Sequence, residues 1–261
     1  MLESSRAREA LLWVLITLLS LIVILGFWHL ASSALGKPYI LPEPSSVLDE
    51  LKELALSGEL ALHAGATLLR VSAALSIATV AAVASGIIAT RTRLGKPLRV
   101  LVALLIPVPT LALLPLFMIL FGFEVIKIAL ISAILYPILS IGVIEAISRL
   151  PREYEEVLAS MGAGFTHLIR YVILPGIFMP LLTSLRICVG VSLSLTFVVE
   201  SIVISPHGLG RYGLGALIET AHRVYDYETV YAGIIAVCTL GFTVYATLWI
   251  AETAYRRPRG L

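Results

Sequence analysis

Long stretches without a charged residue constrain this chain more than any other feature of its sequence. A helix needs about 20 residues to cross a hydrocarbon layer that is roughly 30 Å thick. Stretches of this length that lack Lys, Arg, Asp and Glu lie at 10–36, 71–90, 100–123 and 229–251, and two more, 125–147 and 176–204, contain only isolated charges. With the second stretch extended back to 66–90, the sequence predicts an all-α polytopic membrane protein with six transmembrane helices.

The composition supports this class and excludes several others. Hydrophobic residues make up 59% of the chain and charged residues only 14%, which leaves too little polar surface to cover a soluble domain. A net charge of +2 gives no indication of nucleic-acid binding. Cys188 and Cys238 both fall within apolar stretches and are expected to be ordinary core residues. The histidines show no metal-ligand spacing and no nucleophile is placed beside a base, so we expect neither a metal site nor catalytic residues.

The basic residues predict which side of the membrane each connection occupies. Lys and Arg gather in cytoplasmic segments near the ends of spans. They are concentrated in 1–9, 91–99, 148–175 and 252–261. We therefore expect these segments and both termini to be cytoplasmic, with 37–65 and 205–228 as external loops. Within the first external loop, the segment 41–58 has a capping-box spacing between Ser46 and Asp49 ahead of Leu48, which predicts a short amphipathic helix with Ser46 as its cap.

Two of the predicted spans have features of their own. The first apolar stretch is longer than the 7–15 residues of a secretory signal peptide, so we interpret it as a retained membrane anchor. The second span has a small residue at every fourth position, a pattern typical of close packing between membrane helices. These small residues are Ala74, Ala78, Ala82, Gly86 and Thr90.

A mixed stretch, EEVLASMGAGFTHLIRYVILP at 155–175, stands between two strongly apolar spans. Glu155–Met161 contains good helix formers, Gly162–Gly164 interrupts them, and Phe165–Leu174 predicts a second short helix that Pro175 stops. The stretch also contains apolar residues that a purely solvated loop would not need, namely Val157, Leu158, Met161 and Phe165. We therefore predict two short helices with a glycine joint that face a partner; the alternative is a solvated hairpin without one.

The spacing within this stretch resembles the cytoplasmic signature loop of ABC importer permeases. That loop is written E-A-A, three residues, G, nine residues, I-x-L-P. Glu156-Val157-Leu158 stands for E-A-A, Gly162 follows at the required offset, and Val172-Ile173-Leu174-Pro175 closes the motif. Val157 and Leu158 replace the two alanines and Val172 replaces isoleucine, which enlarges the side chains and leaves the spacing intact.

The resemblance extends over nearly the whole chain. It is strongest to the permeases that import nitrate, sulfonates, taurine, bicarbonate and some vitamin precursors. The similar segments are ILPEPSSVLDEL at 40–51, ATLLRV at 66–71, PVPTLALLPLFMILFG at 107–122 with Lys127 beyond it, LPGIFMP and SLRI within 174–187, and VVES with GLG within 198–210. One departure lies near Leu195, where the family often has a tryptophan.

The resemblance implies a single permease domain over about 66–251 with the type I ABC importer permease fold. It also implies a homodimer in the plasma membrane of a bacterium or archaeon, two ATPase subunits and an external solute-binding protein. The chain has no G-x-x-x-x-G-K-[ST] phosphate loop, so ATP and Mg are expected on the ATPase and not on this chain. The ATPase-coupling residues that the resemblance implies are Glu156, Ala159, Gly162, Ala163, Leu174 and Pro175.

Two charged residues within the fifth span are candidates for the pathway or gate, because a charge in lipid is unfavourable. Arg186 has three interpretations: it attracts an anion, it pairs with Glu145, or it extends to the cytoplasmic interface. Glu200 either orders the external loop around Gly208–Gly210 or forms part of the gate. The residues themselves do not separate these alternatives.

Prolines and hydroxyl groups supply the other pathway candidates. Pro107, Pro109 and Pro115 remove backbone hydrogen bonds from the third span, which permits either a bend with a role in the pathway or a static kink. Ser192 and Thr196 either bond a polar solute or bond their own helix backbone.

An ion-coupled secondary transporter or a channel is the alternative function. A secondary transporter is expected to have inverted repeats, discontinuous spans and coupling carboxylates near the bilayer midplane. The sequence offers at most Glu200 for the last of these requirements. The ABC importer permease is therefore the favoured interpretation.

Overall fold

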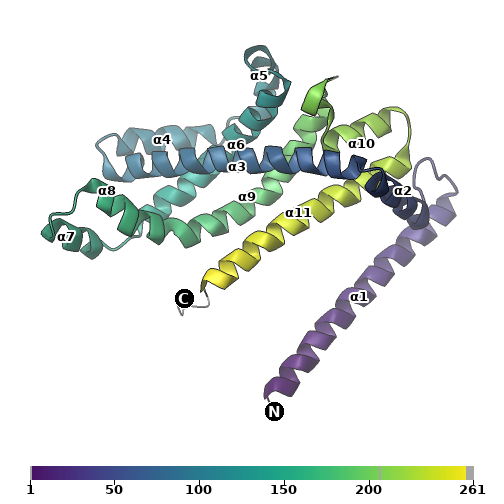
Figure 1. Ribbon diagram of the computed structural model, residues 1–261, viewed down its shortest axis with the longest axis horizontal. Helices are drawn as coiled ribbons and strands as arrows, with labels where there is room; N and C mark the ends of the chain where they lie inside the picture. The colour runs from purple at the N-terminus through teal and green to yellow at the C-terminus, as the bar shows by residue number, and fades with distance from the viewer. Residues whose placement is uncertain (1, 206, 257–261) are drawn as a thin grey trace. The chain divides into compact units, whose positions relative to one another are not determined.

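The computed structural model describes residues 2–205 and 207–256, which are almost entirely helical (Figure 1). Residue 1 of the predicted 1–9 segment, residue 206 of the predicted external loop and residues 257–261 of the predicted tail lie outside the described residues. No strand occurs in the described ranges, and the predicted all-α class is confirmed.

Apolar helices of membrane-spanning length dominate the described chain. Five qualify: Leu15–Leu35, Glu59–Arg91, Phe123–Ser148, Phe165–Ile202 and Tyr227–Tyr255. A bent pair, Gly95–Leu105 with Thr110–Leu120, makes a sixth span if it is counted as one. The six predicted spans therefore correspond to five helices and one broken helix.

The chain divides into two compact units. Unit 1 combines the chain up to Ala61 with Leu217–Ile235. It contains α1 (Leu2–Leu35) and α2 (Pro44–Leu56), together with the first residues of α3 (Glu59–Arg91). The loop between α1 and α2 is held to α1 by hydrogen bonds from Trp28 Nε1 to the Pro42 carbonyl (3.0 Å) and from Ser32 Oγ to the Leu41 carbonyl (2.8 Å).

Helix α2 begins earlier than its capping-box spacing predicts. Its N-cap residue is Glu43 and Pro44 occupies the first turn, so Ser46 lies inside the helix and caps nothing. Proline is favoured at this position because its ring fixes a helical φ and the first N–H has no intrahelical partner. Asp49 pairs instead with Lys52, at 2.8 Å. The amphipathic helix itself is present, and only its predicted start is wrong.

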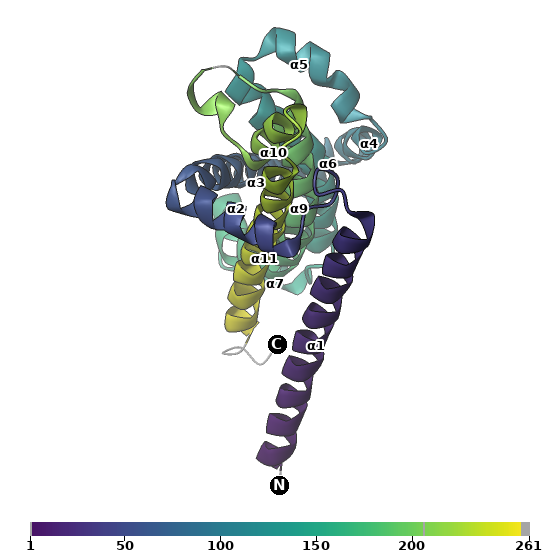
Figure 2. The same cartoon turned by 90° about the vertical axis from the view of Figure 1, so that its right-hand side faces the viewer.

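Unit 2 combines Leu62–Ala216 with the chain from Ala236 onward, and its central elements are α6 (Phe123–Ser148) and α9 (Leu174–Ile202). These two helices pack along each other, as Figures 1 and 2 show. The small residues of α3 pack against α6, and a Cβ atom on Gly86 would lie 2.5 Å from Val143 Cγ1. The predicted packing role of the α3 stripe is thereby confirmed for its buried members Ala74, Ala78, Ala82 and Gly86.

The third predicted span is broken at its prolines. Helix α4 (Gly95–Leu105) is followed by a 3₁₀ turn, η1 (Thr110–Leu113), and by α5 (Leu114–Leu120), with an 83° bend between the two halves. Pro107 and Pro109 have no N–H for the carbonyls of Ala103 and Leu105. Those carbonyls accept instead from the N–H groups of Ile106 and Val108, at 3.3 and 3.2 Å. These bonds span three residues where an α-helix spans four, so the α-helix ends here.

Two other prolines do not break their helices as the sequence predicts. Pro115 lies in the first turn of α5, where its missing N–H removes no helical bond. Pro175 lies in the first turn of α9, and the helical run continues through it from Phe165 to Ile202. A π-helical turn, η2 (Ile169–Ile173), precedes Pro175, and Leu174 donates its N–H to the Ile169 carbonyl. This wider turn makes room for the proline ring.

The remaining helices follow the end of α9. They are a 3₁₀ turn, η3 (Gly208–Arg211), and the helices α10 (Leu214–Arg223) and α11 (Tyr227–Arg256). Before α9 lie the short helices α7 (Glu153–Ser160) and α8 (Phe165–Leu168), which Figure 1 shows at the end where α9 begins.

Candidate functional site

The loop that resembles the permease signature folds as two short helices joined by glycine. We call residues 153–168, which contain α7 and α8, the knob. Gly162 has φ +72°, its N–H bonds the Ala159 carbonyl at 3.0 Å, and the Ala163 N–H bonds the Leu158 carbonyl at 3.0 Å. These two bonds form a Schellman motif, in which glycine ends a helix because the left-handed conformation disfavours a Cβ atom. The predicted helix, glycine joint and helix are confirmed.

The knob presents apolar side chains to its surroundings. Met161 is 76% exposed, Val157 57% and Phe165 52%. An ion pair connects the knob to the rest of unit 2. It joins Arg91, at the end of α3, to Glu155, with Nη2 and Oε1 2.5 Å apart. Glu156, which the motif singles out, is exposed and takes no part in an ion pair among the described residues. The neighbouring Glu155 therefore has a structural contact, while Glu156 leaves its carboxylate available.

The predicted coupling residues separate into two groups. Glu156, Ala159, Gly162 and Ala163 lie together in α7 and its glycine joint. The other two, Leu174 and Pro175, lie after η2 in the first turn of α9, where both are exposed. The knob thus contains the first group only.

At the other end of α9, four charged side chains form a buried cluster. Arg70 of α3 donates to Glu200 of α9, with Nη1 and Oε1 2.6 Å apart. It also donates to Glu124 of α6 from Nε at 3.1 Å and from Nη2 at 2.9 Å. Lys127 lies 3.4 Å from Glu124 and donates to the Gly210 carbonyl at 2.9 Å. We call Arg70, Glu124, Lys127 and Glu200 the charge cluster.

The charge cluster also holds the turn that follows α9. Arg70 donates from Nη2 to the Leu209 carbonyl at 2.8 Å and from Nη1 to the Tyr212 carbonyl at 2.7 Å. Glu200 accepts from Thr67 Oγ1 at 2.9 Å and from the Gly215 N–H at 3.0 Å. This geometry matches the alternative in which Glu200 orders the loop around Gly208–Gly210.

Sequence reasoning selected Glu200 but missed its partners Arg70, Glu124 and Lys127. A signal for Arg70 and Lys127 was present in the similar segments, because Arg70 belongs to ATLLRV and Lys127 follows the proline-rich segment. Three of the similar segments, ATLLRV, VVES and GLG, meet at this cluster.

Arg186 does not pair with Glu145. It pairs with Glu252 of α11, at 2.9 Å, and its guanidinium lies 5.5 Å from the ring centre of Tyr245. Glu145 bonds Arg149 on the exposed surface, at 3.2 Å. The Glu252 side chain is 7% exposed and that of Glu145 59%, so water screens the ion pair of Arg186 with Glu252 less than that of Arg149 with Glu145. The pair joins α9 to α11.

The two hydroxyl candidates bond their own helix. Ser192 Oγ donates to the Val189 carbonyl at 2.8 Å and Thr196 Oγ1 to the Ser192 carbonyl at 2.7 Å. Both side chains are fully buried within the chain. Of the two alternatives for these residues, the structure matches the bond to the helix backbone.

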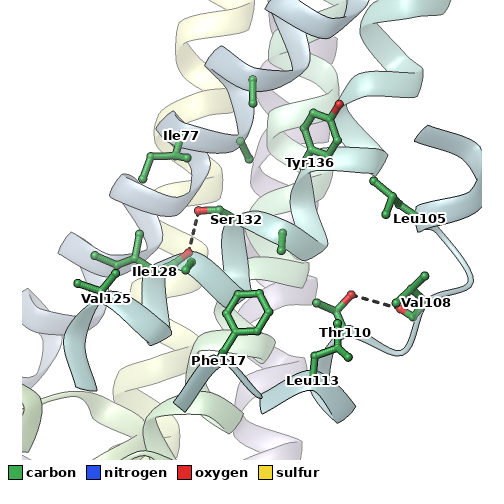
Figure 3. A pocket seen from close by; sticks show the side chains of 14 residues that line it. Ile77, Leu105, Val108, Thr110, Leu113, Phe117, Val125, Ile128, Ser132 and Tyr136 are labelled. Carbon is green, nitrogen blue, oxygen red and sulfur yellow. Dashed lines mark hydrogen bonds between the residues drawn. The ribbon is translucent and has the colours of Figure 1, made fainter. Parts of the chain in front are cut away.

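A cavity of about 630 Å³ lies beside the break in the third span (Figure 3). Its walls come from α3, α6 and the α4–α5 region, and most of them are apolar. Thr110 Oγ1 donates to the Val108 carbonyl at 3.2 Å and Ser132 Oγ to the Ile128 carbonyl at 2.7 Å, as the dashed lines in Figure 3 show. Pro109 lines a smaller cavity of about 350 Å³ on α6 and α9.

Comparisons with known proteins agree with these features. A family profile described as "Binding-protein-dependent transport system inner membrane component" matches residues 71–257. The taurine transport system permease protein TauC of Escherichia coli K12 is 30% identical over 226 residues, which cover 83% of this chain and 79% of TauC. The riboflavin transport system permease protein RibX of Chloroflexus aurantiacus is 29% identical and covers 89% of this chain and 86% of RibX.

A solved structure has the same fold. In the inward-facing MetNI methionine ABC transporter, one chain superimposes with a TM-score of 0.61 at 17% identity, covering 75% of this chain and 95% of that chain. The helical architecture, the glycine-jointed knob and the match over residues 71–257 lead to one conclusion. This chain belongs to the binding-protein-dependent transport system inner membrane components, the permease subunits of ABC importers.

Proposed function

We propose that this chain is the membrane permease of an ATP-driven importer that moves a small solute into the cell by alternating access. The proposed solute is an anion such as a sulfonate, nitrate, taurine or bicarbonate, or else a vitamin precursor. Support for this class comes from relatives whose names refer to taurine, riboflavin, formylaminopyrimidine and aliphatic sulfonates.

The exposed knob is the observation on which the proposal rests. Its apolar side chains, Val157, Met161 and Phe165, are more than half exposed, which is unfavourable in water unless a partner covers them. We propose that a groove on the ATPase is this partner. The left-handed Gly162 sets the angle between the two short helices, and the acidic first turn of α7 places Glu156 at the helix end that favours negative charge.

The proposed assembly is a homodimer of this chain with two ATPase subunits and an external solute-binding protein. ATP and Mg would be held by the ATPase subunits. The 148–175 segment, which contains the knob, would face the cytoplasm together with 1–9, 91–99 and 252–261, because these four segments contain most of the basic residues. The membrane would be the plasma membrane of a bacterium or an archaeon.

Of the pathway candidates, we retain Pro107 and Pro109 as those that shape the pathway. Their break leaves irregular backbone in a predicted span, and such backbone is stable in a membrane only against protein or water. Arg186, Ser192, Thr196 and Glu200 all have hydrogen-bond or ion-pair partners within the chain. We propose that these four residues stabilise the helices that border the pathway.

Reconstitution in liposomes tests the proposal. The chain is purified with and without its cognate ATPase, and ATP hydrolysis is measured with the binding protein and each of taurine, nitrate, bicarbonate and riboflavin. We expect hydrolysis only when the ATPase is present, and stimulation by one solute class. Uptake by the chain alone under an ion gradient would contradict the proposal and support a secondary transporter.

A further inference from the structure

The charge cluster is electrically balanced and almost completely enclosed. It contains two cations, Arg70 and Lys127, and two anions, Glu124 and Glu200. The side chains of Arg70, Lys127 and Glu200 are at most 1% exposed, and only Glu124 reaches solvent, at 34%. A balanced set of charges has no excess charge with which to attract an ionic solute. Its role must therefore be sought in what it holds together.

Arg70 uses its whole hydrogen-bonding capacity. A guanidinium has five N–H groups in a fixed planar arrangement. Here they are directed at both oxygens of Glu124, at Glu200 and at the carbonyls of Leu209 and Tyr212. Separating any of these partners would leave a charged or polar group buried without a bond.

The cluster fastens the turn after α9, residues 207–215, to three helices. Arg70 holds it to α3, Lys127 holds the Gly210 carbonyl to α6, and Glu200 of α9 accepts from the Gly215 N–H. The turn also approaches these helices too closely for side chains. A Cβ atom on Gly213 would lie 2.5 Å from Glu200 Cδ of α9, and one on Gly210 would lie 3.2 Å from Glu124 Oε1 of α6.

A second set of contacts holds the same turn to α3. Thr67 Oγ1 accepts from the Leu214 N–H at 2.8 Å while it bonds Glu200. His63 Nδ1 lies 2.8 Å from the Gly213 carbonyl, and its ring packs edge-on against Tyr212 with centres 5.4 Å apart. These contacts lie one and two helical turns from Arg70, so the turn is fixed to α3 at more than one level.

We propose that the charge cluster is a permanent clamp, which makes the 207–215 turn and the adjoining ends of α3, α6 and α9 one rigid body throughout transport. Removing one partner from a buried, fully bonded charge pair is strongly unfavourable, whereas exposed pairs separate easily. This inference rests on the proposed function. It identifies a part of the permease whose internal arrangement stays the same during alternating access. The movement that opens this side of the permease must take place along surfaces outside the clamp.

Reversible cross-linking tests the clamp in the assembled transporter. In a chain with Cys188 and Cys238 replaced by alanine, His63→Cys and Tyr212→Cys are joined by a short, reducible thiol cross-linker. The complex with the ATPase is then reconstituted, and ATP hydrolysis is measured before cross-linking, after it and after reduction. Each single cysteine variant treated with the same reagent serves as the control.

We expect the cross-link to form and hydrolysis to stay at the rate of the untreated complex. Loss of hydrolysis that reduction restores would overturn the clamp, because it would show that the turn must leave α3 during the cycle. Failure of the two cysteines to cross-link in an active complex would overturn it too. If no active complex with the ATPase assembles even for the unsubstituted chain, the proposed function fails instead.

A second readout covers the case in which the cysteine pair destabilises the chain. Nitroxide labels are attached at the exposed residues Leu209 and Phe123, in complexes diluted so that each contains one labelled subunit. The distance between the labels is measured without nucleotide and after trapping with ATP and vanadate. The clamp predicts the same distance in both states, and a shift in the trapped state would overturn it.

Discussion

The knob and the charge cluster lie at opposite ends of α9, and they differ in which side chains they bury and which they expose. The charge cluster encloses its polar groups, and Arg70 and Glu200 find all their partners within the chain. The knob exposes Met161 and Phe165 and is tied to the rest of unit 2 by the Arg91–Glu155 pair. One region is complete in the single chain and the other leaves apolar surface uncovered. The difference indicates that the charge cluster holds parts of this chain together and that the knob is the surface available to a partner.

Glycine serves each region for a different physical reason. At Gly215 a Cβ atom would lie 2.9 Å from Glu200 Cβ, so glycine allows the end of the turn to approach the charge cluster closely. At Gly162 no atom lies within 4 Å of a Cβ position, and only the left-handed φ of +72° requires glycine. The space around the Cβ position of Gly162 is open, so a partner surface can approach it.

The largest effect is expected from Arg70→Met in the charge cluster. This change leaves Glu200 buried without its cation, which is expected to cost about 3–5 kcal/mol of stability. Arg70→Lys keeps the charge but has only three N–H groups for five acceptors, so it should be intermediate. Thermal unfolding in detergent measures both. Arg149→Met removes an exposed ion pair and is the control, with an expected change of about 1 kcal/mol or less. Equal unfolding temperatures for Arg70→Met and Arg149→Met would remove the contrast between the two regions.

The next largest effect is expected in the knob, where Gly162→Asp should weaken the association of this chain with the ATPase and leave the chain folded. A non-glycine residue in the left-handed region costs roughly 1–2 kcal/mol, and the new carboxylate would enter the proposed interface. We expect at least about tenfold weaker association, equivalent to ~1.4 kcal/mol, in co-purification with the ATPase. Gly36→Asp is matched, because Gly36 is also exposed, has φ +61° and faces open space. If both variants bind the ATPase equally, the knob is a solvated hairpin.

A smaller effect is expected at Arg186 and Glu252, a pair intermediate between exposed and enclosed. The Arg186 side chain is 22% exposed and that of Glu252 7%. In a double-mutant cycle with Arg186→Met and Glu252→Gln, we expect a coupling energy of about 1 kcal/mol or more in thermal stability. The same cycle with Glu145→Gln should be additive. Coupling to Glu145 in place of Glu252 would contradict the pairing.

The smallest effect is expected from Glu156→Ala. The side chain is exposed, so the loss of its favourable charge at the start of α7 should change stability by about 0.3–1 kcal/mol. ATPase association should weaken less than in Gly162→Asp, because the backbone turn is unchanged. Titration of the ATPase against each variant gives the order. A stronger effect for Glu156→Ala would mean that charge, and not the shape of the joint, dominates the contact.

Local signals in the sequence were sufficient for the knob. Its helix formers, its glycine and its apolar residues act within one or two turns of chain, and the two short helices formed where they were predicted. The end of the second helix was not predicted correctly, because the effect of Pro175 depends on the preceding π turn. A bend at Pro107 and Pro109 was one of the predicted alternatives, but prolines do not by themselves specify its angle of 83°.

The charge cluster was largely out of reach of such reasoning. Arg70 is 54 residues from Glu124 and 130 residues from Glu200, so no spacing rule connects them. Lys and Arg side chains near the ends of spans commonly extend to water. Arg70 and Lys127 were therefore not recognised as members of a buried cluster. Pairing with Glu145 was one of three open interpretations of Arg186, and the partner that the fold supplies, Glu252 of another span, was not among them. Long-range charge pairing requires the fold itself.

Site-specific cross-linking of the knob tests the central claim most directly. A photoreactive residue replaces Met161, which is 76% exposed, or Leu56, which is 89% exposed on unit 1 at the end of α2. Each complex with the ATPase is irradiated in membranes, and the products are identified by mass spectrometry. We expect a covalent product with the ATPase from position 161 and none from position 56. An intact complex in which position 161 gives no product with the ATPase would contradict it.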